Sequence, residues 1–129
     1  MLDLHGIAGV GVDLCAISRI ERAMEKERFL ERFYTLEERD YLSRKGKGSV
    51  QSAAAMFAAK EAVTKALGTG IAKGVCLNQI SVTHDELGAP GVKLTDTALQ
   101  RMREIGGSRV LLSLSHEGDM AIAFAVIEA

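Results

Sequence analysis

The stretch from Met56 to Gly70 (MFAAKEAVTKALGTG) constrains the fold of this chain more than any other part of its sequence. Five alanines fall between positions 54 and 62, and alanine has the highest helix propensity of the natural residues. Gly68 stands at the end of the pattern, where a left-handed residue commonly caps a helix. The stretch therefore predicts a long helix that ends at about Gly68.

One face of this helix carries two charges in line with an aromatic residue. Phe57, Glu61 and Lys65 are spaced i, i+4 and i+8, so they share one stripe of the helix surface. A Glu–Lys pair at this spacing is commonly a surface ion pair, which contributes only about 0.2–0.5 kcal/mol. The alternative is a charged pair at the edge of a core, where it is better placed to serve a site.

Composition limits the classes of function. A chain of 129 residues suits one domain, and we expect a single domain over residues 1–129. A net charge of −1 and the absence of Trp argue against a nucleic-acid binder that relies on basic patches or base stacking. Cys15 and Cys76 lack CxxC spacing, which is typical of proteins of the reducing cytosol.

The N-terminal segment shows no targeting signal. It has no basic region, and Asp3, His5 and Asp13 interrupt its apolar residues. We therefore expect no signal peptide, no membrane span and a cytoplasmic location.

The other elements follow from periodicity and from turn residues. Ile7–Leu14 reads as a buried strand with Asp13 at its end, where Asp13 or Ser18 would cap the next helix. Three shorter helices are expected over residues 17–33, 35–43 and about 95–105, the second of them with a capping box from Thr35 to Glu38. The long helix is expected to begin at Ser49 or Ser52, after a flexible joint over residues 45–49. Strands are expected at 75–83 and 92–94, with a turn between them.

The last quarter of the chain predicts a β-hairpin, with strands at 109–116 and 120–127. His116 ends an apolar row on the first strand, where a single histidine is more often structural than catalytic. On the second strand, Ala121, Ala123 and Ala125 face one way, and Ile122, Phe124 and Val126 face the other. Because both faces are apolar, we expect a homo-oligomer.

Three short motifs stand out along the chain: GVDL at 11–14, FAAKEAVTKALGTG at 57–70 and SLSH at 113–116. A fourth segment, LGAP at 87–90, lies before the last of them. Their order and spacing resemble the holo-acyl-carrier-protein synthase family of 4′-phosphopantetheinyl transferases, from about Gly9 to Glu128. The resemblance implies an α+β fold, in which a small antiparallel sheet packs against a long helix and shorter helices.

The resemblance also implies an activity. Members transfer the 4′-phosphopantetheine arm of coenzyme A to a serine of apo-acyl carrier protein, with magnesium, and release adenosine 3′,5′-bisphosphate. They support fatty acid biosynthesis and are typically homotrimers that bind coenzyme A between neighbouring subunits. Rival readings are a transferase for secondary-metabolite carriers and a non-catalytic trimeric binding module. A binding scaffold needs none of Asp13, Glu61 and Lys65, so their joint presence argues against the module.

The family pattern assigns residues by position. Asp13 and Glu61 map to the metal ligands, which fits the preference of Mg²⁺ for one or two carboxylates plus substrate phosphates. Lys65 maps to a catalytic charge near the phosphates, and Glu61 is also a candidate acceptor of the serine proton. The residues expected to contact coenzyme A are Lys65, His116, Gly68, Thr69, Gly70 and Lys47.

Two further expectations concern basic residues. Met56 stands where members often carry Arg, so Lys45 or Lys47 is expected to replace that phosphate contact. Arg19, Arg22 and Arg28 are expected to attract an acidic carrier protein, although interleaved charge is also typical of a solvated helix face.

Overall fold

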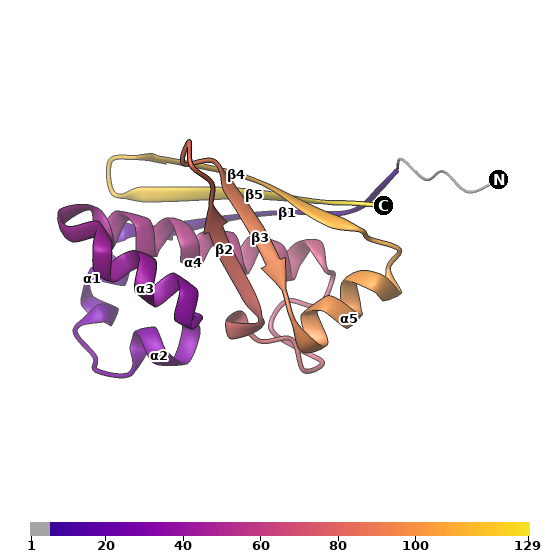
Figure 1. Ribbon diagram of the computed structural model, residues 1–129, viewed down its shortest axis with the longest axis horizontal. Helices are drawn as coiled ribbons and strands as arrows, with labels where there is room; N and C mark the ends of the chain where they lie inside the picture. Colours follow the sequence, from indigo (N-terminus) through magenta and orange to yellow (C-terminus); the bar gives the residue numbers. More distant parts are fainter. Residues whose placement is uncertain (1–5) are drawn as a thin grey trace.

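The computed structural model describes residues 6–129 (Figure 1). In chain order its elements are β1 (Ile7–Ala16), α1 (Ile17–Met24), α2 (Phe29–Phe33), α3 (Leu36–Lys45), the 3₁₀ turn η1 (Gly46–Gly48), α4 (Ser49–Ala66), the 3₁₀ turn η2 (Leu77–Gln79), β2 (Ile80–His84), β3 (Pro90–Leu94), α5 (Asp96–Glu104), β4 (Arg109–Glu117) and β5 (Met120–Glu128). Asp3 and His5, which entered the expectation of no signal peptide, lie outside the described residues. Within residues 6–129, no helix is both long and apolar enough to cross a membrane.

The predicted α+β fold is confirmed. β1, β5 and β4 form an antiparallel sheet in that order, and β2 pairs with β3 in a separate hairpin. α4 lies along one face of the three-stranded sheet (Figure 1), chiefly over β1 and β5. α1 and α3 pack against α4, and the β2–β3 hairpin runs across it. The long helix is therefore the element that most others contact.

The interface between α4 and β1 brings two backbones into contact. A Cβ atom added to Gly11 would overlap the carbonyl oxygen of Ala62, and one added to Gly9 would overlap that of Ala66. Only glycine permits this approach. The rest of the sheet surface under the helix is equally small, because Ala121, Ala123 and Ala125 of β5 are fully buried there.

The end of α4 follows the sequence prediction. Gly68 has φ of +80° and donates its N–H to Lys65 O at 3.0 Å, while the N–H of Gly70 donates to Thr64 O at 3.1 Å. These bonds satisfy carbonyl groups that the last helical turn leaves without partners.

The predicted helix over 17–33 is wrong in its continuity. It is broken into α1 and α2 by residues 25–28, all of which are charged and exposed, so no core contact holds them in a helix. The two short helices pack separate apolar residues: α1 buries Ile20, and α2 places the partly buried Phe29 and Phe33 against Phe57 of α4. Residues 45–49, expected to be a flexible joint, are instead the end of α3, η1 and the first residue of α4.

Other boundaries also differ from expectation. β1 runs two residues beyond Leu14, and α1 begins after Ala16 without a side-chain cap, so neither Asp13 nor Ser18 caps it. Ser18 instead donates its N–H and Oγ–H to the Asp119 carboxylate at 2.9 and 2.6 Å.

The strand expected over 75–83 begins only at Ile80. Before it, the Gln79 side chain donates to Gly74 O at 3.1 Å and accepts from Ala98 N at 2.9 Å. Such local side-chain bonds compete with strand pairing.

The outer face of the three-stranded sheet is uncovered in the single chain and is apolar over β1 and β5, whereas β4 adds Leu111, Ser113 and Ser115 to it. On β1, Val10, Val12 and Leu14 are 53–56% exposed, and across from them on β5, Phe124 and Ile122 are 45% and 38% exposed. The alternation predicted for the terminal hairpin is thus observed. A continuous apolar sheet face of this kind marks an interaction surface.

We expect Gly11→Ala to destabilise the protein strongly. The added methyl group would push β1 away from the Ala62 carbonyl, and overpacking of this kind typically costs about 1–3 kcal/mol. Gly48→Ala is the matched control, because the nearest atoms to its added methyl group, on the Lys45 side chain, are 3.8 Å away. Chemical denaturation measures both variants. Equal stabilities would contradict the close contact between β1 and α4.

Candidate active site

Asp13 meets α4 because of the glycines that precede it. Along β1, Gly9, Gly11 and Asp13 point toward the helix, and the contact at the glycines brings the next inward-facing residue to the helix surface. Lys65 Nζ donates to Asp13 Oδ1 at 2.8 Å and to Val12 O at 3.1 Å. The Asp13 side chain is 19% exposed and that of Lys65 51%, so this ion pair lies at the rim of the contact.

Glu61 lies one helical turn before Lys65 and is half-buried. Burial raises the pKa of Glu61, and the charge of Asp13 raises it further, whereas Lys65 and Arg19 act in the opposite direction. The hydrogen bond to Asp13, together with the charge of Asp13, raises the pKa of Lys65. The site therefore keeps a lysine firmly protonated beside two carboxylates that repel each other.

Arg19 connects this site to α1. Its guanidinium lies 5.7 Å from the ring centre of Phe57, one turn before Glu61 on α4. The Phe57 ring is fixed in turn by Phe29, stacked at 6.0 Å, and by Phe33, edge-on at 6.1 Å. Thus the predicted stripe Phe57–Glu61–Lys65 runs from a buried aromatic cluster to the rim.

The cluster suits a magnesium ion. Its two carboxylates, Asp13 and Glu61, are near enough that one shifts the pKa of the other. Among residues 6–129, no group of three or more His, Cys, Asp or Glu side chains could hold a metal ion. Zinc sites need three or four protein ligands. Mg²⁺ keeps several waters and needs only one or two carboxylates with substrate phosphates, so the donor set fits it.

The residues expected to bind coenzyme A are not gathered in one place within a chain. His116 lines a groove of about 290 Å³, together with Tyr41, Lys45, Met56 and His84. This groove lies on the β4 side of α4, whereas Lys65 reaches the β1 edge of the sheet, and β5 lies between the two strands. The structure therefore does not bring His116 and Lys65 together in one chain.

The remaining expected contacts are also dispersed. Lys47 lies exposed on η1 and does not line the groove, whereas Lys45, the other candidate to replace an arginine at Met56, does. Gly68, Thr69 and Gly70 follow the C-terminus of α4, where Thr69 lines a separate hollow with Lys73 and Arg101.

Sequence reasoning missed two residues of the groove. The rings of Tyr41 and His84 stack at 4.2 Å and 6°, and Lys45 Nζ lies 5.6 Å from the Tyr41 ring centre. Burial, together with the charge of Lys45, lowers the pKa of His84. No motif signals this pair, because α3 and β2 are brought together only by the fold.

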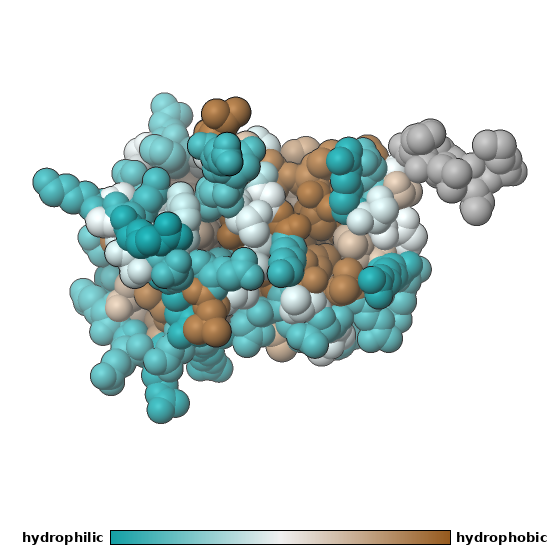
Figure 2. Space-filling model, in the orientation of Figure 1, coloured by the Kyte–Doolittle hydropathy of each residue, from teal (hydrophilic) through white to brown (hydrophobic). Residues whose placement is uncertain are grey.

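Arg19 and Arg22 lie on α1, as expected, whereas Arg28, expected on the same helix, lies on the turn before α2. Arg22 and Arg28 are exposed, and Arg19 is the one that reaches the Asp13–Glu61–Lys65 cluster. Figure 2 shows hydrophilic side chains projecting over the part of the surface formed by α1–α3. Glutamates are interleaved with the arginines there.

Comparison with known proteins decides the family. A model of the 4′-phosphopantetheinyl transferase superfamily matches residues 9–125. The chain belongs to this superfamily. It is 45% identical over 122 residues to a holo-[acyl-carrier-protein] synthase of Treponema denticola, a match that covers 95% of this chain and 98% of that protein.

Solved structures of the superfamily share the fold. The holo-[acyl-carrier-protein] synthase of Neisseria meningitidis matches with a TM-score of 0.86 at 40% identity, covering 96% of this chain and 100% of that one. The enzyme of Bacillus anthracis, in complex with CoA (3′,5′-ADP), matches with a TM-score of 0.80 at 35% identity, covering 95% and 97%. The family predicted from the three motifs is confirmed.

We expect Glu61→Gln to stabilise this transferase near neutral pH. A carboxyl whose pKa is raised in the folded state contributes stability at acidic pH, and this contribution is lost as the pH rises through the folded-state pKa. The amide avoids that loss. Without added metal, the free energy of unfolding of the variant should exceed that of the wild type at neutral pH, and the difference should shrink in acid.

The control is Glu25→Gln, at an exposed residue just after α1. Urea denaturation at a series of pH values measures both variants. A Glu61→Gln protein that is less stable than the wild type at neutral pH would contradict the conclusion that burial and the charge of Asp13 disfavour the ionised Glu61 carboxylate.

Proposed function

We propose that this chain is a holo-[acyl-carrier-protein] synthase, which transfers the 4′-phosphopantetheine group of coenzyme A to a serine of apo-acyl carrier protein. The observation that carries the proposal is the cluster of Asp13, Glu61 and Lys65 at the contact of β1 and α4. The names of the relatives support it. We further propose that the enzyme is cytoplasmic, requires Mg²⁺ and serves fatty acid biosynthesis.

Each residue of the cluster has a distinct task in the proposed reaction. Lys65, protonated and half-exposed, is placed to bind the diphosphate and to offset charge on the departing 3′,5′-bisphosphate. Asp13 holds the Lys65 ammonium in place through its hydrogen bond. Asp13 and Glu61 would together hold Mg²⁺, which when bound neutralises diphosphate charge that would otherwise repel the nucleophile.

Glu61 is also the candidate to accept the proton of the carrier serine. A general base works best when its pKa approaches the working pH. Burial and the neighbouring Asp13 move the pKa of Glu61 in that direction. Removal of the serine proton would turn its oxygen into the nucleophile that displaces the bisphosphate.

The proposed functional unit is a homotrimer with coenzyme A between neighbouring chains. The sheet has β1 at one edge and β4 at the other, and its outer face is apolar. If three sheets turn these faces toward a common axis, the β1 edge of each chain meets the β4 edge of the next. The Asp13–Glu61–Lys65 cluster of one chain then faces the His116 groove of its neighbour, which a single chain does not achieve.

Carrier recognition is proposed to involve α1 and the turn before α2. The carrier serine must reach Asp13 and Glu61, and Arg19 is the arginine nearest to both. Arg22 and Arg28 extend exposed positive charge away from the site. An acidic carrier of the fatty-acid type would be attracted by these charges at long range.

Incubation of the protein with apo-acyl carrier protein, coenzyme A and Mg²⁺ tests the proposed reaction. Mass spectrometry should show one added phosphopantetheine on the carrier. Asp13→Asn and Glu61→Gln should each reduce the rate about 10²–10³-fold, as loss of charge stabilisation does elsewhere. Lys65→Met should lower kcat more than it raises KM for coenzyme A.

The control for Lys65→Met is Lys93→Met, which removes a lysine of similar exposure on β3. Its rate should match that of the wild type. An unmodified carrier in the wild-type reaction would refute the proposed function. A secondary-metabolite carrier modified in preference to a fatty-acid carrier would change the proposed substrate.

The oligomeric state has its own test. Light scattering should report a trimer for the wild type. Phe124→Glu, in the middle of the exposed sheet face, should dissociate it, because a carboxylate would be buried at the interface without a partner. Leu87→Glu is the control, since Leu87 is 95% exposed in the β2–β3 turn and lies off this face. A wild-type monomer with full activity would contradict the shared site.

Carrier docking predicts an effect of charge reversal. Arg19→Glu, Arg22→Glu and Arg28→Glu combined should raise KM for the carrier about tenfold or more at low salt, and the difference from the wild type should shrink as salt screens the charges. KM for coenzyme A should change much less. Reversing Arg44, Lys93 and Arg103 instead gives a control with equal charge, because these residues are exposed on α3, β3 and α5, away from the proposed docking surface. Equal carrier kinetics for the two triple variants would place docking elsewhere.

A further inference from the structure

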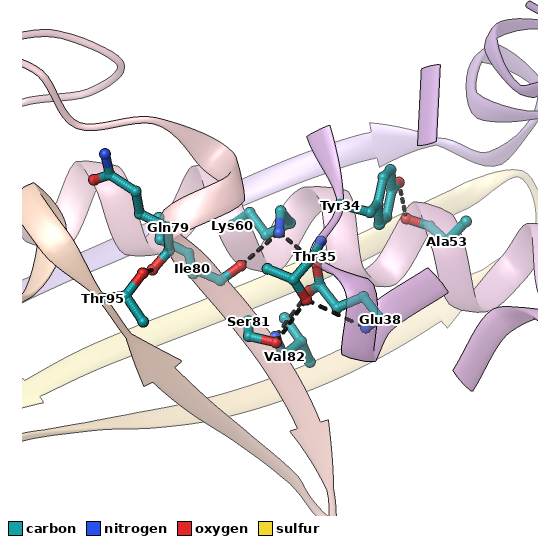
Figure 3. A network of polar contacts seen from close by, with 10 residues as sticks. All are labelled: Tyr34, Thr35, Glu38, Ala53, Lys60, Gln79, Ile80, Ser81, Val82 and Thr95. Carbon is teal, nitrogen blue, oxygen red and sulfur yellow. Dashed lines mark hydrogen bonds and ion pairs between the residues drawn. The ribbon is translucent and has the colours of Figure 1, made fainter. Parts of the chain in front are cut away.

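A buried ion pair lies next to the site residue Glu61. Lys60, the residue before Glu61, and Glu38 on the first turn of α3 both have fully buried side chains. Lys60 Nζ donates to Glu38 Oε1 and to the carbonyl oxygen of Ile80 on β2. The pair therefore connects three elements, α3, α4 and β2 (Figure 3).

The Glu38 carboxylate accepts three hydrogen bonds, the first of them from Lys60. Its Oε1 also accepts from Thr35 N at 2.9 Å, and its Oε2 accepts from Val82 N at 2.8 Å. The Glu38 N–H in turn donates to Thr35 Oγ1 at 3.2 Å, which completes the capping box at the start of α3. The Thr35 hydroxyl in turn contacts that of Ser81 at 2.8 Å. Hydrogen bonds depend on angle as well as distance. The network therefore fixes how α3, α4 and β2 are oriented to one another (Figure 3).

Stability alone does not account for a pair placed in this position. Removing two charges from water is costly, and apolar residues of similar volume often stabilise a core as well or better. The burial that lowers the pKa of Lys60 reflects this cost, which the charge of Glu38 offsets only in part. Buried ionic groups have their best-attested use in fixing register.

The side chains at the contact between α4 and the sheet do not by themselves fix the rotation and axial position of the helix. Its helix side is Ala62 and Ala66, and its sheet side is glycine and alanine. Small, similar side chains let the helix approach closely, but they offer few shapes that interlock, and uniform cores are under-specified. Aromatic contacts at Phe57 and the bond from Tyr34 OH to Ala53 O at 2.6 Å hold the N-terminal half of α4.

Lys60 supplies a fully buried directed contact in the second half of α4, whereas the bonds of Lys65 to Asp13 and Val12 lie at the exposed rim. Successive side chains on a helix are separated by about 100° around its axis. A fixed Lys60 side chain therefore sets the direction of Glu61, and a small rotation of α4 would carry the Glu61 carboxylate away from Asp13.

We propose that the Lys60–Glu38 pair is a positioning device, which fixes the rotation and axial position of α4 so that Glu61 faces Asp13. The proposal rests on the proposed function for its effect on turnover, and on the fold alone for its effect on the helix. Lys60 and Glu38 themselves touch no substrate. They act through Glu61.

The decisive variant is Lys60→Met combined with Glu38→Leu, which replaces both charges with apolar side chains. It should unfold cooperatively, like the wild type. In NMR spectra, the nuclear Overhauser contacts of Gly9 and Gly11 with Ala66 and Ala62 should weaken or move to other alanines. Electron paramagnetic resonance with Mn²⁺ as probe, in the presence of coenzyme A, should show weaker metal binding.

Turnover by the double variant should also fall. We expect kcat to fall about 10- to 100-fold, as misplacement of a reacting group by about 1 Å does, with KM for the carrier unchanged. Ser81→Ala is the control, because it removes a buried polar contact between α3 and β2 without touching α4. It should lower stability and leave the Gly9 and Gly11 contacts, Mn²⁺ binding and kcat as in the wild type.

A folded double variant with wild-type glycine contacts, Mn²⁺ affinity and kcat would overturn the proposal. If the double variant does not fold, Glu38→Gln takes its place, because it keeps the shape of the Glu38 side chain and weakens the ion pair with Lys60. The glycine contacts, the Mn²⁺ affinity and kcat are then measured on that variant. If the wild type transfers no phosphopantetheine, the proposed function fails, while the NMR contacts still decide whether the pair positions α4.

Discussion

The backbone contact between β1 and α4 is the constraint on which the rest of the structure depends. Gly9 and Gly11 let the strand touch the carbonyl groups of Ala66 and Ala62. Without that approach, Asp13 would not reach the Lys65 ammonium at 2.8 Å. Small residues in a core usually mean lost apolar burial, but here they bring a strand and a helix close enough for their charged residues to form one site.

The same contact determines where function can lie. α4 covers one face of the sheet, so its two flanks are separate surfaces, one carrying Asp13, Glu61 and Lys65 and the other carrying the His116 groove. The opposite face of the sheet is apolar and open. In the proposed trimer, these two flanks would be the two halves of one site, and each interface of a cyclic assembly would complete it.

Much of this could be predicted from the sequence, because local signals decide it. The alanine-rich helix, its end at Gly68 and the terminal hairpin follow from propensity, the left-handed glycine and period-two alternation. That Asp13 lies beside Glu61 and Lys65 of α4 was predicted only through the resemblance to the family. The sequence did not reveal the break at residues 25–28, because the charges that break the helix are also good helix formers and only the missing core contacts distinguish them.

The buried pair and the groove were beyond sequence reasoning for a different reason. Lys60 reads as one more helix lysine and Glu38 as a capping-box residue, and nothing local says that their side chains meet. Tyr41 and His84 likewise stack only because α3 and β2 are packed together. Contacts between elements far apart in the chain depend on how helices and strands pack, which a single sequence does not report.

Subunit complementation tests the central claim of a site divided between chains. An Asp13→Asn variant is mixed with a Lys45→Glu, His116→Ala variant, and the two are dissociated and reassembled. If each site combines the cluster of one chain with the groove of its neighbour, about a quarter of the interfaces in a random mixture contain both intact halves, and phosphopantetheine transfer should recover to about that level. A mixture no more active than its two components would contradict the account, because it would place both halves in one chain.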